Sequence, residues 1–84
     1  MNKETLEKIK SGELCILKIT HTEVLQGKFS LMIVGPERLE EFTNSQQLSL
    51  TELFNISDKE VEENSIAARH IKNTIKTLRE LSHG

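Results

Sequence analysis

The amino-acid sequence predicts an α+β fold with an N-terminal helix, an antiparallel β-hairpin or small sheet, two short helices and one long C-terminal amphipathic helix. Two observations predict this class. Residues 14–19 and 24–34 are rich in branched apolar residues that fall on both alternating faces of a strand, whereas the segments before and after them repeat apolar residues every three or four positions. With 84 residues and a single cysteine, the chain has room for one domain, residues 1–84, and no disulfide framework.

The first predicted helix covers residues 2–10 and is short and amphipathic. Asn2 is a helix-capping residue type, because its side-chain oxygen accepts a hydrogen bond from a free amide in the first turn. Leu6 and Ile9 lie three positions apart on one face, and Gly12 is placed to end the helix.

The two strand segments form the predicted hairpin. Residues 14–19 carry apolar side chains on both alternating faces, which indicates an inner strand, and residues 24–34 place Phe29, Leu31 and Ile33 on one face. A hairpin alone is only marginally stable in water. The helices are therefore expected to cover one of its faces.

Turn and loop signals separate these elements. The chain is expected to reverse over residues 20–23, and Gly27 interrupts the second strand where a bulge or bend fits. The polar residues 43–47 are predicted to form a loop. Between the second strand and this loop, Pro36 opens a predicted short helix over residues 36–42, since proline is tolerated in the first helical turn. This helix is expected to bury Leu39 and Phe42.

Two serine–glutamate pairs predict the starts of the remaining helices. Ser49 with Glu52 and Ser57 with Glu60 have the spacing of a capping box, in which the hydroxyl and the carboxylate satisfy free amides at a helix start. A short helix near residues 50–55 and a long helix near residues 58–81 follow.

Charge is polarised along the second half of the chain. Residues 37–63 hold eight acidic residues against Arg38 and Lys59, whereas the long helix is basic on one face and apolar on the opposite face. Three candidate surfaces follow: a basic face for an anionic or protein partner, formed by Arg69, Lys72, Lys76 and Arg79; an acidic partner surface, formed by Asp58, Glu60, Glu62 and Glu63; and an apolar stripe for the core or an oligomer contact, formed by Ile71, Ile75, Leu78 and Leu81.

These surfaces allow more than one interpretation. The basic face is typical of a solvated helix surface, and it also suits nucleic-acid phosphates or an acidic protein. The acidic segment of one copy can meet the basic helix of another copy or of the same chain, so the charge contrast can serve folding or homo-oligomerisation.

Residues 47–61 resemble the helix-turn-helix family. Leu50, Phe54, Ile56 and Val61 occupy the apolar positions of that motif, and Asn55 is a residue type that adopts the left-handed turn conformation. In a second frame, residues 57–61 start the first helix, and residues 71–75 look like the recognition helix of response-regulator output domains. The resemblance implies a DNA-binding regulator that uses the basic face.

Catalytic and metal-binding groups are sparse. His21, His70 and His83 have no second ligand at the spacing of a zinc site, and Cys15 lies in an aliphatic strand segment, where cysteine is typically a small buried residue. The sequence therefore predicts no enzyme, no metal site and no cofactor.

The functional prediction is a small non-enzymatic protein that acts through protein–protein contacts as an inhibitor or adaptor and forms a homo-oligomer. Size and composition are similar to those of accessory proteins of phages and mobile elements. A lone cysteine, a charged N-terminal segment and the lack of an apolar run long enough to span a bilayer predict a cytoplasmic protein with no membrane contact. The alternatives are the DNA-binding regulator, and a binder of small anionic ligands or nucleotides between subunits that uses Lys18, Lys28 or Arg38.

Overall fold

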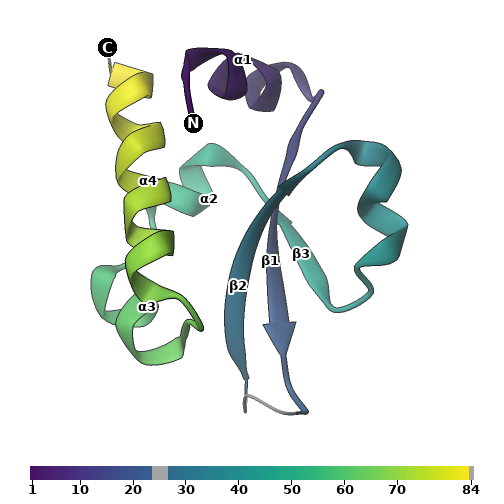
Figure 1. The fold of residues 1–84 in the computed structure, drawn as a ribbon, viewed down its shortest axis with the longest axis vertical. Helices are drawn as coiled ribbons and strands as arrows, with labels where there is room; N and C mark the ends of the chain where they lie inside the picture. Colours follow the sequence, from purple (N-terminus) through teal and green to yellow (C-terminus); the bar gives the residue numbers. More distant parts are fainter. Residues whose placement is uncertain (24–26, 84) are drawn as a thin grey trace.

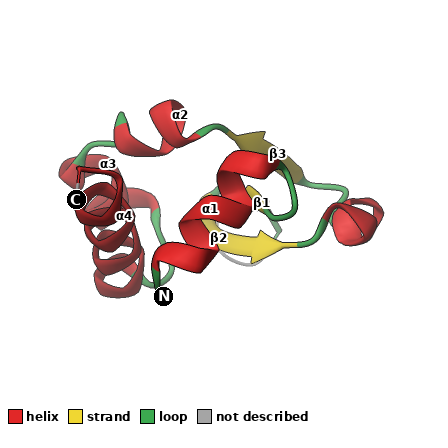
Figure 2. Cartoon of the chain, turned by 90° about the horizontal axis from the view of Figure 1, so that it is seen from above, coloured by secondary structure: helices red, strands yellow, loops and turns green. Residues whose placement is uncertain are grey.

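A computed structural model of the chain describes residues 1–23 and 27–83, and it confirms the α+β class. Three antiparallel strands form one sheet in the order β2-β1-β3, and helices flank it (Figures 1 and 2). The elements in chain order are α1 (Lys3–Ser11), β1 (Cys15–His21), β2 (Lys28–Val34), the 3₁₀ helix η1 (Pro36–Glu41), β3 (Ser45–Leu48), α2 (Leu50–Phe54), α3 (Asp58–Asn64) and α4 (Ala68–His83).

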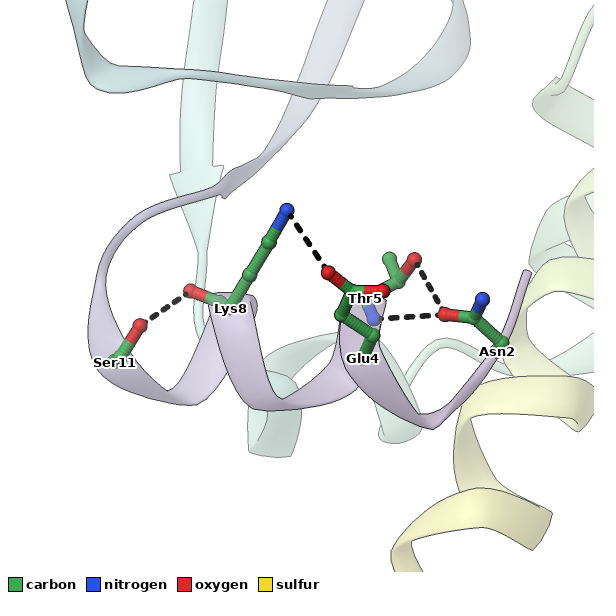
Figure 3. Close-up of polar contacts among 5 residues, drawn as sticks. All are labelled: Asn2, Glu4, Thr5, Lys8 and Ser11. Carbon is green, nitrogen blue, oxygen red and sulfur yellow. Dashed lines mark hydrogen bonds and ion pairs between the residues drawn. The ribbon is translucent and has the colours of Figure 1, made fainter.

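Helix α1 is capped at both ends as the sequence predicts. The Asn2 side-chain oxygen accepts hydrogen bonds from the Thr5 amide at 3.1 Å and from the Thr5 hydroxyl at 3.3 Å (Figure 3). Gly12 ends the helix in the left-handed conformation, with φ of 88°, and its amide donates to the Ile9 carbonyl. Lys8 and Glu4, one helical turn apart, form an ion pair at 3.5 Å. This pair adds little to the stability of the helix because both groups are solvated.

The hairpin forms, but residues 20 and 21 of the predicted reversal, residues 20–23, belong to strand β1. Strand β1 continues to His21, which pairs with Lys28 of β2. The Thr20 amide donates to the Asn44 carbonyl at 2.9 Å, which holds this end of β1 in the sheet. The predicted start of the second strand, residues 24–26, lies outside the described residues. Gly27 bends the chain with φ of 80°, and its amide donates to the His21 carbonyl at 2.8 Å.

Strand β3 replaces most of the loop predicted over residues 43–47. It pairs antiparallel with β1, with Ile16 opposite Leu48 and Ile19 opposite Ser45. The segment lacks the apolar alternation of a strand because Ser45, Gln46 and Gln47 are polar, and both glutamines are exposed. Its pairing rests on backbone hydrogen bonds to the free side of β1.

The short helix after β2 is confirmed as η1, although it buries less than expected. Leu39 and Phe42 are half-buried. On the sheet face away from the main core, Cys15, Leu17 and Val34 are buried. In both views η1 lies on the opposite side of the sheet from α4 (Figures 1 and 2).

The predicted long helix over residues 58–81 is wrong: it is divided into α3 and α4. The break begins at Ser65, which is buried and donates its hydroxyl proton to the Val61 carbonyl. The next amide, that of Ile66, donates to the Phe29 carbonyl of β2 at 3.1 Å. A tertiary hydrogen bond to the sheet therefore replaces the helical bond, which is why local helix propensity fails at this point.

The helix starts follow the predicted serines, with one difference. Ser49 and Glu52 form the complete capping box of α2. Ser57 caps α3 by accepting from the Glu60 amide at 3.1 Å, but the Glu60 carboxylate pairs with Lys18 of β1, so this cap works in one direction. Asn55 ends α2 with φ of −85°, in the right-handed region, so the expected left-handed turn is also wrong.

The core lies between one face of the sheet and the helices. Helix α4 supplies three of its residues and runs beside α2, α3 and the N-terminal segment (Figure 1). Within residues 1–23 and 27–83, no helix is both long and apolar enough to cross a bilayer. The buried core residues are Leu6, Ile16, Phe29, Leu48, Leu53, Val61, Ile71, Ile75 and Leu78.

Candidate functional site

The predicted basic face is partly engaged inside the chain. Lys72 forms an ion pair with Glu62 of α3. The Arg79 guanidinium donates to the Phe54 carbonyl at the end of α2 at 2.8 Å and lies 5.5 Å from the centre of the Phe54 ring. Arg69 and Lys76 are exposed. Two of the four cations therefore hold α4 against its neighbouring helices.

The predicted acidic surface is divided in the same way. Glu60 lies 3.5 Å from the Lys18 ammonium, which also sits 4.7 Å from the centre of the Phe29 ring, and Glu62 contacts Lys72. Asp58 and Glu63 are exposed. The structure thus brings acidic α3 against cations of the same chain, which is one of the arrangements that the charge contrast allows.

The apolar stripe of α4 packs within the chain. Ile71, Ile75 and Leu78 are buried in the core, and Leu81 is half-buried at its edge. Three of the four stripe residues are therefore inaccessible to a second subunit.

The other candidate groups lie apart from one another. Arg38 pairs with Glu41 at 3.0 Å within η1, and this hydrogen-bonded carboxylate raises the pKa of Arg38. Lys18 is held by Glu60, and Lys28 is exposed at the start of β2. The three cations proposed for an anionic ligand thus occupy three separate places in the fold.

Histidine and cysteine form no metal centre in the described part of the chain. His21 Nε2 lies 3.0 Å from the Ser30 hydroxyl on the neighbouring strand, whereas Cys15 is buried and His83 is exposed at the end of α4. Residues 1–23 and 27–83 hold no group of three histidine, cysteine or carboxylate side chains close enough to share a metal ion.

A groove that the sequence did not predict lies between β2 and α4. It has a volume of about 290 Å³. Leu31 and Ile33 of β2 line one side, Leu78 lies on the helix side, and His70 and Thr74 supply polar atoms. We call this feature, together with the outer edge of β2, the β2–α4 groove; its lining is completed by Met1, Ile16, Met32 and Leu53.

The backbone of β2 faces this groove with unpaired peptide groups. The Phe29 carbonyl points away from β1, because it accepts from the Ile66 amide. Peptide groups alternate in direction along an antiparallel strand, so those of Leu31 and Ile33 also point outward, and those of Ser30 and Met32 point toward β1. Across the described residues, no hydrogen bond reaches the outward groups of Leu31 or Ile33.

Exposed apolar side chains gather at the same edge. In the described ranges, the large apolar residues with the highest exposure are Met1 at 55%, Ile66 at 45% and Met32 at 38%. Met1 and Met32 border the groove; the Met32 side chain alternates with those of Leu31 and Ile33 and lies on the sheet face away from α4, and the Ile66 amide donates to the Phe29 carbonyl. In both views the N-terminus lies beside α4, as this placement of Met1 requires (Figures 1 and 2).

The two edges of the sheet differ in chemistry. Strand β3 is four residues long and carries Ser45, Gln46 and Gln47, a short polar edge of the kind that resists pairing with other chains. Strand β2 is seven residues long, and its single charged residue, Lys28, lies at one end. The apolar edge is therefore the one suited to binding.

No family model matches this chain, and neither the curated proteins nor the solved structures provide a match. The surface chemistry is thus what points to a function. Unpaired peptide groups, exposed apolar side chains and a groove coincide at β2, whereas the charged candidates predicted from the sequence are spread over the surface and partly neutralised.

Proposed function

We propose that this chain is a small binding protein that acts through protein–protein contacts and not by catalysis, with the β2–α4 groove as its binding surface. The observation that carries this proposal is the coincidence of unpaired outward peptide groups at Leu31 and Ile33 with exposed Met32 and Ile66. An open strand edge is a template for an added strand, and exposed apolar side chains along that edge add area that a partner can cover.

The binding mode that fits is strand addition. An extended segment of another polypeptide places its backbone along β2, and its amides and carbonyls pair with those of Leu31 and Ile33. Side chains on one face of the added segment then lie along the groove beside half-buried Leu31 and Ile33, and those on its other face lie beside exposed Met32. Backbone bonds supply affinity, and the apolar groove selects the sequence that fits.

The charges support protein over DNA as the partner. A duplex-binding helix needs cations that are available to phosphates, but Lys72 and Arg79 are engaged by α3 and α2. Arg69 and Lys76 alone provide little of the counterion release that drives DNA binding. A role as an inhibitor or adaptor in the reducing cytoplasm agrees with the buried free thiol of Cys15.

Selection of peptides from a displayed library tests the proposal. We expect the selected peptides to be extended, with apolar residues at alternate positions, and to shift the amide resonances of Leu31, Met32 and Ile33. N-methylation of the Leu31 amide, introduced by chemical synthesis, removes one outward donor and leaves the β1 pairing intact; it should weaken peptide binding. The matched control is N-methylation of Gln47, an outward amide on the opposite edge, which should change nothing. Peptides that bind equally well to both modified chains would refute the proposal.

A further inference from the structure

We infer that the partner which the β2–α4 groove takes is a second copy of this chain, with the two β2 strands paired antiparallel about Met32 to join both sheets. This inference rests on the proposed function, because it names the occupant of the same surface. Three properties of β2 support it: its pattern of outward peptide groups, its distribution of charge and the difference between the two sheet edges.

The outward peptide groups of β2 are self-complementary. A twofold axis at Met32 places Leu31 opposite Ile33 of the second copy, and Ile33 opposite the second Leu31. Each such pair consists of two outward-facing residues, so each exchanges both of its hydrogen bonds. Met32 then lies opposite itself in the close, non-hydrogen-bonded position, and the side chain that is 38% exposed in one copy becomes covered.

The charges of β2 and its flanks favour the antiparallel direction. Lys28 lies at the start of the strand, and exposed Glu37 follows its end, just after Pro36. Antiparallel pairing brings Lys28 of one copy to the end at which Glu37 of the other lies. Parallel pairing would instead place the two Lys28 ammonium groups at the same end, where they repel. The antiparallel direction thus keeps the two Lys28 ammonium groups at opposite ends of the interface.

The fold limits the size of this contact and limits the assembly to two copies. Ser65 and Ile66 already cover the outer edge at Phe29, so pairing is confined to the segment around Met32. Such a short interface predicts a dimer that dissociates on dilution. Because the remaining edge, β3, is short and polar, the contact joins two copies through the same surface and does not extend into a fibre.

Cysteine cross-linking tests the register. In a Cys15→Ala background, the variant Met32→Cys places two thiols in a non-hydrogen-bonded antiparallel pair, where the α-carbons are about 4.5 Å apart and a disulfide fits. We expect rapid formation of a covalent dimer under mild oxidation. The matched control Gln47→Cys, on the outer side of β3, should remain monomeric. Equal cross-linking rates for the two variants would overturn the inference.

Sedimentation equilibrium on the unmodified chain gives an independent readout. We expect a reversible monomer–dimer equilibrium, and N-methylation of Leu31, which removes two bonds from each dimer, should weaken it by roughly tenfold to a hundredfold. A chain that stays monomeric at every concentration overturns the inference. If that monomer still binds selected peptides at Leu31 and Ile33, the proposed function stands; if it binds none, both fall.

Discussion

The substitution Leu78→Ala tests whether the apolar stripe of α4 is the core of a single chain. Leu78 has 0% exposure and belongs to the same buried cluster as Ile71 and Ile75. The change removes a Cγ and two Cδ carbons, which costs about 2.5 kcal/mol in transfer free energy. The cavity that remains raises the total loss to about 3–4 kcal/mol. A chain of this size has a total unfolding free energy of about 4–13 kcal/mol, so the loss is a large fraction of it.

Urea denaturation followed by circular dichroism measures this loss. We expect a lower midpoint, an unchanged slope, and the same difference between Leu78→Ala and the unmodified chain in dilute solution, where any dimer has dissociated. Lys76→Ala is the matched control, because Lys76 lies on the exposed side of the same helix. A loss below about 1 kcal/mol, or one that vanishes in dilute solution, would show that the stripe packs against another subunit and would refute this description of the core.

Two further predictions concern the ends of α2. Arg79→Ala removes both the hydrogen bond to the Phe54 carbonyl and the contact with its ring, and it should cost about 1 kcal/mol in the same denaturation assay, whereas Arg69→Ala should cost nothing measurable. Equal losses would contradict this assignment. Glu52 accepts a hydrogen bond from the Ser49 amide, which lowers the pKa of Glu52. Its contribution to stability is therefore complete above the ordinary glutamate pKa, about 4.3, and is lost as the pH falls through the lowered value. Glu52→Gln should be less stable than the unmodified chain at pH 7, and the difference should disappear in acid; a difference that is independent of pH would contradict the cap.

Local signals predicted most of the secondary structure. The caps at Asn2, Ser49 and Ser57 act through hydrogen bonds within three residues of each other, so the sequence contains the whole interaction. Tertiary contacts account for the errors. Strand β3 forms because β1 offers a free edge, although Gln46 and Gln47 show no apolar alternation. The helix breaks at Ser65 because the Phe29 carbonyl takes the next amide.

The candidate surface was less predictable than the fold. Segregation of charge on α4 was visible in the sequence, but its engagement with Glu62 and Phe54 depends on how α2, α3 and α4 pack. The alternation of Leu31, Met32 and Ile33 indicated a strand with two apolar faces. That β2 would form an edge of the sheet, and that its outer peptide groups would remain unpaired beside α4, follows only from the strand order.

Amide hydrogen exchange along β2, followed by NMR at increasing protein concentration, tests the binding edge most directly. In dilute solution the amides of Leu31 and Ile33 should exchange quickly, whereas those of Ser30 and Met32, which point toward β1, should be protected. Raising the concentration should protect Leu31 and Ile33 as the second copy pairs with them. Slow exchange at Leu31 and Ile33 in the most dilute samples would show that the edge is already covered and would contradict the proposed binding surface.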